Sequence, residues 1–292
     1  MNCANKTIQK LKMNFYKQVL AFYVRISAPF RLRPRKKLRF EIDIAANCNL
    51  NCKGCFHFSP LVDNDYVNPD KLEKDFKRLS ELAGRKNENI ELMGGEPLLH
   101  PQINIIIEMS RKYFDGNISI VTNGILLTKM NEEFWMSCKK NKINILVTSY
   151  PIKLDRKLIK KTAKSYSVKI KMRMQVMSNH TWCRLPKDIQ GNQDIKDSFK
   201  NCLIANFCIS LKNGKLATCC LPFVADRFNN FYNEKFITEE NDSIDIYSAK
   251  NIEEIYEFLS KPIPFCRYCK IRQSEYGISW GISKKDIHEW ID

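Results

Sequence analysis

The chain has 292 residues, of which 44% are hydrophobic, and a formal net charge of +16 at pH 7. Global disorder is excluded, because a chain with this share of apolar residues can bury a large core. The excess of cations indicates an anionic partner, such as nucleic acid, a membrane surface or a nucleotide-linked substrate, although a lysine-rich proteome would produce the same balance.

Twelve cysteines are the other informative feature of the composition. The N-terminus lacks an uninterrupted apolar segment with a small-residue cleavage site, as a secretory signal peptide would have. No stretch reaches the roughly 18 apolar residues that can span a bilayer. We therefore expect a cytoplasmic protein, because clustered cysteines in a reducing compartment more often hold metal than form disulfides.

Residues 1–37 are predicted to form an N-terminal amphipathic helix followed by a basic linker. Apolar residues recur every three or four positions from Ile8 to Ile26, and Pro29 ends this pattern before a run of arginines and lysines. The helix either packs on the main domain or lies on a membrane surface, as peripheral amphipathic helices do.

From residue 38 onward, short apolar strands alternate with amphipathic helices. Asn68-Pro69 is typical of a helix start, and Gly84 is a plausible end of the same helix. Repeated β–α units imply a parallel sheet or barrel. Strands are expected at 40–44, 90–93, 118–122, 143–148 and 168–176, with helices at 68–84, 103–113, 131–140 and 155–165.

The alternation of strands and helices ends after about residue 180. A β-hairpin is expected around Asn213-Gly214, because this dipeptide between two short apolar runs is a strong hairpin signal. Residues 224–248 show no clear period, and a short helix is expected at 252–259. We expect residues 201–292 to form a separate cysteine-rich module.

Three cysteines lie within eight residues directly after the first predicted strand: Cys48, Cys52 and Cys55. A structural zinc site would need a fourth ligand, which His57 could supply. A disulfide would leave one cysteine over. An iron–sulfur cluster held by only three thiolates would leave one iron open for another ligand.

The CxxxCxxC spacing resembles the signature of radical S-adenosylmethionine (radical SAM) enzymes. In that family the open iron is chelated by the amine and carboxylate of the cofactor's methionine part. The resemblance implies that these three cysteines hold the catalytic [4Fe–4S] cluster and that S-adenosylmethionine binds to it. The position before the third cysteine is usually aromatic and packs near the adenine, whereas here it is Gly54, so Phe56 and Phe58 are candidate substitutes.

Two further motifs resemble those of the same family, although each alone would also fit an ordinary turn. Gly94, Gly95, Glu96 and Pro97 follow the second predicted strand and resemble the GGEP motif that binds the methionyl amino group, with Glu96 as the side-chain contributor. Asn123 follows the third predicted strand and resembles the ribose-contacting position.

All three motifs lie just past the ends of successive predicted strands, which converge on the ligand-binding face of a parallel barrel. The segment Thr148-Ser149-Tyr150-Pro151 ends the fourth strand and should face the same cavity, with Ser149 as the candidate contact. Arg173 in the fifth strand could pair with the cofactor carboxylate, although a structural role is open for both residues. The resemblance covers residues 38–176 and implies an α/β fold with a partial (β/α)6-type TIM barrel, the radical SAM core, over residues 38–200.

A second set of cysteines surrounds the predicted hairpin and resembles the auxiliary-cluster modules of the family, called SPASM and, in a shorter form, twitch. The longer form needs further cysteines after the CxxC, and none follows here, so the resemblance implies one auxiliary [4Fe–4S] cluster. Its implied ligands are Cys202, Cys219, Cys266 and Cys269.

Other readings of these cysteines stay open. Cys208 and Cys220 compete with Cys202 and Cys219 as ligands, and a four-cysteine zinc site is the alternative to iron–sulfur. The remaining cysteines are expected to be ordinary buried or free thiols: Cys3, Cys138 and Cys183.

The resemblance implies that reductive cleavage of S-adenosylmethionine gives a 5′-deoxyadenosyl radical, which takes hydrogen from a substrate carbon. A flavodoxin or ferredoxin would supply the electron, while the protein excludes water and aims the radical. The motifs CKGCFHFSP and GGEPLLHP resemble members associated with carbohydrate or surface-polysaccharide biosynthesis. We expect oxidation or epimerisation of a carbohydrate or nucleotide-sugar.

Alternative functions are a peptide-modifying or RNA-modifying radical enzyme and a non-enzymatic zinc- and nucleic-acid-binding protein. No RNA-binding motif of recognisable type is present, and residues 1–37 are short for a peptide-recognition domain. We therefore expect a small anionic substrate, no nucleic acid, and membrane contact only through the N-terminus.

Overall fold

The computed structural model describes residues 38–85, 89–174 and 181–291, together with Val19, Phe22 and Ile26. These three are helical and exposed, and the rest of the predicted N-terminal segment lies outside the described residues. Within the described ranges, no helix is long and apolar enough to cross a membrane.

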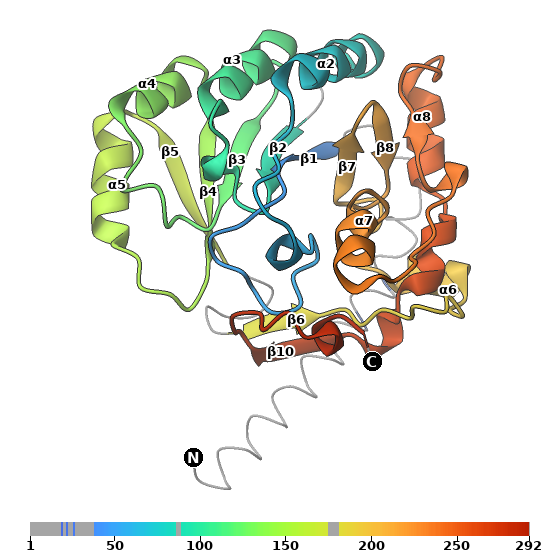
Figure 1. The fold of residues 1–292 in the computed structure, drawn as a ribbon. Coiled ribbons are helices and arrows are strands. Elements are labelled where there is room, and N and C mark those ends of the chain that lie inside the picture. The colour runs from blue at the N-terminus through green and yellow to red at the C-terminus, as the bar shows by residue number, and fades with distance from the viewer. Residues whose placement is uncertain are drawn as a thin grey trace, which may run out of the picture.

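Five β-strands alternate with four α-helices in the first part of the described chain, and the helices flank one side of the sheet (Figure 1). The predicted elements of this region are confirmed, except that residues 175 and 176 lie outside the described part. The elements are β1 (Arg39–Ala45), α2 (Pro69–Ala83), β2 (Asn89–Gly94), α3 (Ile103–Tyr113), β3 (Ile118–Thr122), α4 (Glu132–Lys140), β4 (Asn144–Ser149), α5 (Arg156–Ser165) and β5 (Lys169–Met174).

The ends of these helices have local causes. The Asn68 side chain accepts hydrogen bonds from the backbone N–H groups of Asp70 (2.9 Å) and Lys71 (3.2 Å) at the start of α2. A cap of this kind contributes about 1 kcal/mol. Gly84 ends α2 with a φ of 76°, which glycine adopts without strain.

The sheet continues past β1 into the second half of the chain. Its order is β5-β4-β3-β2-β1-β7-β8-β9, and β7 (Ile209–Lys212) runs parallel to β1, with Ile209 opposite Phe40. Six neighbouring strands are therefore parallel. The predicted hairpin is confirmed: β8 (Lys215–Ala217) returns antiparallel to β7, and both turn residues, Asn213 and Gly214, have positive φ.

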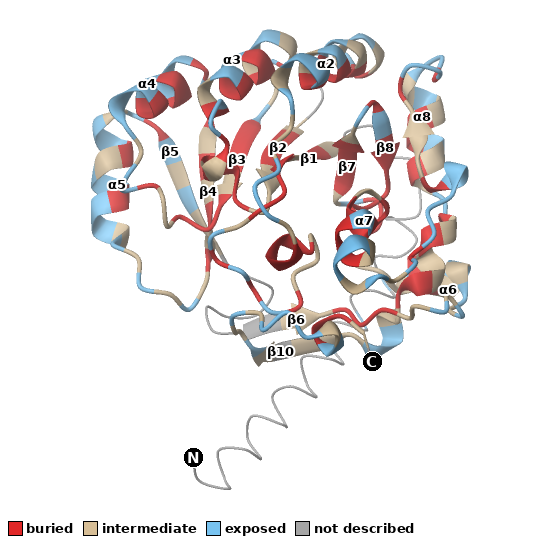
Figure 2. Cartoon of the chain, in the orientation of Figure 1, coloured by how far each residue is buried: buried red, intermediate tan, exposed pale blue. Residues whose placement is uncertain are grey.

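The main core lies between the sheet and the inner faces of α2 to α5, where buried side chains concentrate (Figure 2). Phe40, Ile42 and Ile44 lie on one face of β1 and are at most 1% exposed, and Glu41 on the opposite face is 6% exposed. Coverage of both faces is typical of a parallel strand. The α/β class with a mostly parallel sheet is confirmed.

The second half of the chain adds smaller elements. The helix predicted at 252–259 is present as α8 (Ile252–Leu259), and β9 is the two-residue strand Ile244–Asp245. The others were not predicted and are α6 (Ile195–Asn201), α7 (Leu221–Tyr232) and an antiparallel ribbon of β6 (Thr181–Arg184) with β10 (Glu275–Ser279).

The reading of residues 224–248 as a stretch without a period was wrong for its first part. Leu221, Val224, Ala225 and Phe228 are buried along one face of α7, at the spacing of an amphipathic helix. They belong to a second apolar cluster that also contains Trp290 near the end of the chain.

Candidate functional site

A cavity of about 390 Å³ lies at the C-terminal ends of the parallel strands. The loop after β1 contributes the three cysteines of the CxxxCxxC motif to its wall. The ends of β2, β3 and β4 and the residue Arg173 on β5 also line it. Predicted site residues that line it are Cys48, Cys52, Cys55, Gly94, Gly95, Asn123 and Arg173.

The three sulfurs of this loop already accept hydrogen bonds. Cys48 Sγ accepts from the Leu50 backbone N–H at 3.4 Å and from the Asn123 amide at 3.7 Å. Cys52 Sγ accepts from the Trp280 indole at 3.2 Å and from the Tyr150 hydroxyl. Donors of this kind commonly surround thiolates that bind metal.

These thiols form no disulfide in the structure. Burial raises the pKa of Cys48 to about 11 and also raises the pKa values of Cys52 and Cys55. Metal binding would therefore have to displace protons. Within the described residues, no three His, Cys, Asp or Glu side chains are already arranged around a point where a metal ion could lie. The fit to a cluster accordingly rests on the shared cavity, the free thiols and their hydrogen-bond donors.

The alternative zinc ligand His57 also lines the cavity, but its ring is engaged elsewhere. Its Nδ1 lies 3.4 Å from Asp43 Oδ2. Phe56 lines the cavity, whereas Phe58 is 1% exposed and packs against Phe228 and Trp290. Of the two aromatic candidates, only Phe56 therefore reaches the cavity.

Neighbouring protein atoms leave no room for side chains at Gly94, the last residue of β2, and at Gly95. A Cβ at Gly94 would lie 2.1 Å from Asp43 Oδ1, and one at Gly95 would lie 2.1 Å from the Asn47 carbonyl oxygen. The Gly95 N–H donates to the Ala45 carbonyl at 2.6 Å. From the sequence, we expected these glycines to let the backbone approach a ligand. In the structure, the backbone at these glycines instead lies against the end of β1 and the start of the cysteine loop.

Glu96 does not line the cavity and is fully buried. Its carboxylate accepts hydrogen bonds from Thr122 Oγ1 (2.6 Å), the Asn123 N–H (2.9 Å) and the Leu98 N–H (3.2 Å). Pro97 is also buried outside the cavity wall, at the start of a short 3-10 helix (Pro97–Leu99). Glu96 thus holds the end of β3, and with it Asn123.

Replacing Glu96 by glutamine is expected to change the pH dependence of stability. Burial raises the pKa of Glu96 from 4.5 to about 7. Folding therefore favours the protonated form of Glu96. The resulting contribution to the free energy of unfolding is fully present below about pH 4.5 and is lost as the pH rises through 7. It amounts to about 3 kcal/mol. The free energy of unfolding, measured by urea titration, should fall less between pH 5 and pH 7.5 in Glu96→Gln than in the wild type. Equal losses would contradict the prediction.

The remaining predicted residues divide between the wall and the interior. Asn123 lines the cavity, and its amide donates to Asn49 Oδ1 at 2.7 Å. Ser149 is buried away from the cavity, while Thr148 and Tyr150 line it, because successive side chains of a strand point to opposite faces. From the segment predicted to face the cavity, this alternation could have selected Thr148 and Tyr150 in place of Ser149.

Arg173 projects into the cavity, as its place on the fifth strand suggested. Its Nη1 lies 3.4 Å from Glu91 Oε2 on β2, and Glu91 also lies 3.5 Å from Arg39 Nη1. Glu41 also lines the cavity and is 6% exposed. The wall therefore carries both a cation and an acid, and the sequence motifs did not indicate the acid.

The second set of cysteines is divided between two places. Cys208 and Cys220 line the first cavity, together with Cys183. The Arg39 guanidinium donates to Cys208 Sγ at 3.5 Å. The other four line one small void of about 20 Å³ with mostly apolar walls: Cys202, Cys219, Cys266 and Cys269. All are free thiols, so the structure brings together the four predicted ligands and separates their two competitors from them.

Lys187 lies beside this second set, and no sequence signal identified it. The residue is 2% exposed, its ammonium donates to the Leu185 carbonyl at 2.8 Å, and it lies 5.7 Å from the Phe56 ring centroid. Burial lowers the pKa of Lys187, whereas the negative charge of nearby thiolates, Cys269 first among them, would raise it.

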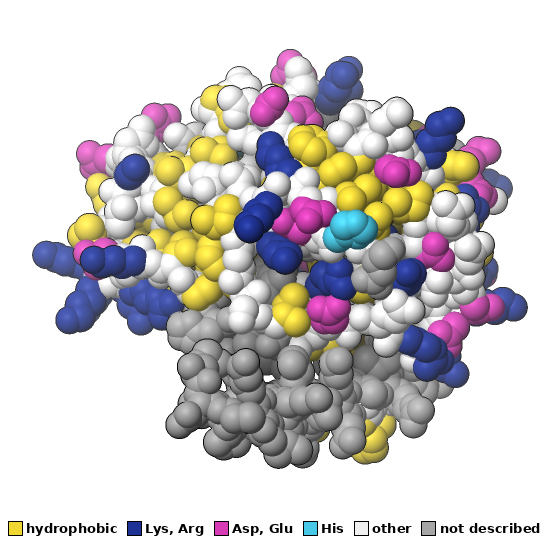
Figure 3. All heavy atoms as spheres, turned by 60° about the horizontal axis from the view of Figure 1, so that its bottom comes forward, with side chains coloured by type: hydrophobic (Ala, Val, Ile, Leu, Met, Phe, Trp, Pro, Cys, Tyr) yellow, Lys and Arg dark blue, Asp and Glu magenta, His cyan; other side chains and the backbone are white. Residues whose placement is uncertain are grey.

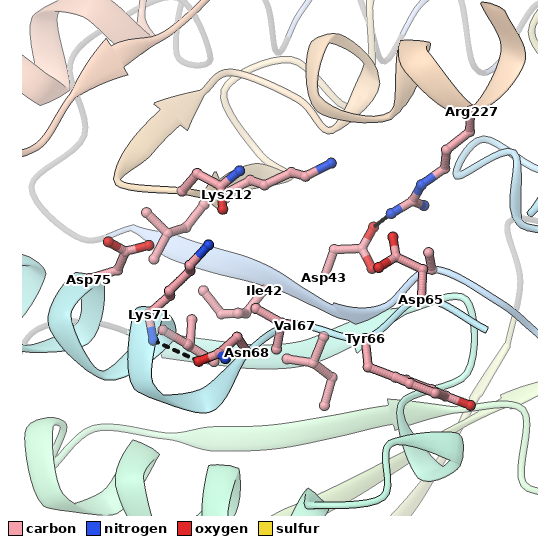
Figure 4. A pocket seen from close by; sticks show the side chains of 15 residues that line it. Ile42, Asp43, Asp65, Tyr66, Val67, Asn68, Lys71, Asp75, Lys212 and Arg227 are labelled. Carbon is pink, nitrogen blue, oxygen red and sulfur yellow. Dashed lines mark hydrogen bonds and ion pairs between the residues drawn. The ribbon is translucent and has the colours of Figure 1, made fainter. Parts of the chain in front are cut away.

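Another hollow, of about 260 Å³, lies between β1, α2 and β7 and contains none of the predicted site residues (Figure 4). Arg227 of α7 reaches across it to Asp43 Oδ2 at 2.9 Å, and donates to the His57 carbonyl at 2.9 Å. This buried ion pair connects α7 to β1 and to the end of the cysteine loop.

The surface charge is unevenly distributed on the face seen in Figure 3. Basic side chains gather at the edge formed by α5, whose ten residues include five cations and no acid. Elsewhere on this face, acidic, basic and apolar groups are mixed.

Residues 42–180 match the family model of the Radical SAM superfamily. This part of the chain is therefore similar to the radical SAM domain, whose superfamily uses a [4Fe–4S] cluster and S-adenosylmethionine as cofactors. The chain also resembles the structure of BtrN in complex with AdoMet and 2-DOIA, with a TM-score of 0.50 and 17% identity over 80% of this chain and 93% of that one. That likeness supports the fold.

Curated relatives match a shorter part. The probable GTP 3',8-cyclase of Thermoplasma volcanium is 33% identical over 93 residues, which are 32% of this chain and 28% of the relative. That of Methanocaldococcus jannaschii is 31% identical over 121 residues, 41% of this chain and 39% of the relative. The chain thus spans well under half of these relatives. The superfamily and the relatives are enzymes, so the prediction of an enzyme is confirmed.

Proposed function

We propose that the protein is a radical SAM enzyme in which Cys48, Cys52 and Cys55 bind the catalytic cluster. The observation that carries this proposal is the single cavity lined by these free thiols, by Gly94 and Gly95 at the end of β2, and by Asn123. When bound, the cluster and S-adenosylmethionine supply hydrogen abstraction from a substrate carbon.

The protein's own residues would hold and orient these groups. Gly94, Gly95 and Asn123 are proposed to contact S-adenosylmethionine, because they line the cavity beside the cysteines. Glu96 and Ser149 are proposed as supporting residues, because both are buried outside the wall. Tyr150 joins the proposed site, since it lines the cavity and bonds to Cys52.

We further propose that residues 201–292 form a twitch-like module whose Cys202, Cys219, Cys266 and Cys269 hold an auxiliary [4Fe–4S] cluster. Two observations support an anionic site. The four thiols line one void, and the buried Lys187 ammonium lies beside it. Among the described residues the Lys187 ammonium has one hydrogen-bond acceptor. Burying such a group costs several kcal/mol, and metal-bound thiolates would offset that cost.

The proposed substrate is a small anionic carbohydrate or nucleotide-sugar, which would be oxidised or epimerised. Arg173 and Glu41 in the cavity wall support a polar substrate, because they offer both a cation and a hydrogen-bond acceptor. The relatives named as probable GTP 3',8-cyclases favour the nucleotide-linked members of this class.

The proposal is tested by anaerobic purification followed by metal analysis and assay. We expect brown protein that absorbs near 400 nm, contains about eight irons per chain, as two [4Fe–4S] clusters require, and forms 5′-deoxyadenosine from S-adenosylmethionine and dithionite. Colourless protein with stoichiometric zinc would contradict both cluster assignments.

The second site has its own prediction. Replacing Cys266 and Cys269 together by alanine should remove about four irons per chain. The matched control replaces Cys208 and Cys220, which line the other cavity, and should keep the full iron content. Iron loss in the control but not in the first variant would reverse the ligand assignment.

A further inference from the structure

The tail after β10 packs directly on the cysteine loop, although more than 200 residues separate them in the sequence. The Lys53 N–H donates to the Gly281 carbonyl, and the Ser283 N–H donates to the Asn51 carbonyl, both at 2.8 Å. Cys52 and Ile282 form an antiparallel bridge between these bonds. Figure 1 shows the loop after β1 descending to the β6–β10 ribbon.

The same tail also occupies the space beside Gly54. Gly54 has a φ of 63°, and a Cβ there would lie 3.0 Å from the Glu289 carbonyl oxygen. The next residue, Trp290, is 2% exposed and donates from its indole to the Cys55 carbonyl at 2.9 Å. A side chain at position 54 would therefore crowd the backbone of the tail and would be strained by the positive φ, which gives a physical reason for glycine in the middle of this loop.

One side chain of the tail reaches a sulfur. The Trp280 indole N–H donates to Cys52 Sγ at 3.2 Å, and its ring centroid lies 6.3 Å from that of Tyr150. Tyr150 is the second donor to the same sulfur. Cys52 is 6% exposed, so water contributes little to stabilising charge on this sulfur.

We propose that the C-terminal tail contributes to the function of the first cysteine site. Its residue Trp280 raises the reduction potential of a cluster bound at Cys48, Cys52 and Cys55. The inference rests on the function proposed above. Reduction adds a negative charge that is shared with the cysteine sulfurs. A hydrogen bond to a sulfur stabilises the reduced form more than the oxidised form, and such bonds are known determinants of cluster potentials. Trp280 acts through Cys52 and is thus a positioning residue.

The test compares midpoint potentials in anaerobic titrations followed by electron paramagnetic resonance. Trp280→Phe keeps an aromatic ring and removes the N–H donor, so the potential of the first cluster should shift to a more negative value at unchanged iron content. Tyr150→Phe should shift it in the same direction. The matched control is Ile282→Val in the same tail, whose side chain is 65% exposed and should leave the potential unchanged.

The Cys266→Ala/Cys269→Ala variant identifies which signal belongs to the first cluster. If the wild type holds no iron at the first site, the proposed function fails. If Trp280→Phe loads iron fully and keeps the wild-type potential, the role of Trp280 is refuted and the function stands. If Trp280→Phe binds too little iron for its potential to be measured, Trp280→His is compared instead, because histidine retains an N–H donor. Wild-type iron content together with the wild-type midpoint potential in Trp280→His supports the proposal. Wild-type iron content with a shifted potential refutes it.

Discussion

Replacing Cys55 by alanine should abolish the formation of 5′-deoxyadenosine and remove about four irons per chain, because a cluster held by three thiolates cannot spare one. The backbone contacts at this position would survive, since Phe58 and Trp290 donate to the Cys55 carbonyl rather than to its sulfur. The measurement is iron content and product formation on anaerobic protein.

The control for this experiment is Cys138→Ala. Cys138 is fully buried in the main core on α4 and is a free thiol outside both cysteine sites. Its replacement should cost about 1 kcal/mol of stability through the lost packing and keep both iron and activity. Activity that survives in Cys55→Ala would refute the assignment of the first site.

A second large effect is expected from Gly95→Ala. The added Cβ would lie 2.1 Å from the Asn47 carbonyl oxygen and 2.6 Å from that of Ala46. Both are backbone atoms, so relief requires the start of the cysteine loop to move. We expect a loss of about 3 kcal/mol in the free energy of unfolding, measured by urea titration, together with reduced iron at the first site.

Gly281→Ala is the matched control, because a Cβ at Gly281 meets nothing within 4 Å although its carbonyl bonds to the same loop. Its free energy of unfolding should stay within about 0.5 kcal/mol of the wild type. If the two glycine variants behaved alike, the close approach of Gly95 to the loop would not be the reason for glycine there.

The β/α part of the fold could be predicted closely because its signals are local. Asn68, Asn131 and Asp155 each cap the helix that follows by accepting a backbone hydrogen bond from a residue two or three positions ahead. Helix α7 was missed although Leu221, Val224, Ala225 and Phe228 have helical spacing. The β6–β10 ribbon had no such signal, because its strands lie about 90 residues apart.

The candidate site also combines residues that local signals could identify with residues that only the fold reveals. Ser149 and Tyr150 are adjacent in the chain and point to opposite faces of the sheet, so a stricter use of the period of two would have chosen Tyr150 for the cavity wall. For Glu96, the motif indicated a ligand contact, but only the fold shows that Thr122 and Asn123 occupy its carboxylate. Trp280 carries no motif, and its hydrogen bond to Cys52 exists only because the tail packs on the loop.

The sequence by itself determined the order of strands and helices and the presence of two groups of cysteines, because both depend on residues close together in the chain. The tertiary structure decided which thiols share a cavity. Cys219 and Cys220 are adjacent, yet the first lines the small void and the second lines the cavity of the cysteine loop. Side-chain direction depends on how segments distant in sequence pack together, and spacing along the chain does not encode it.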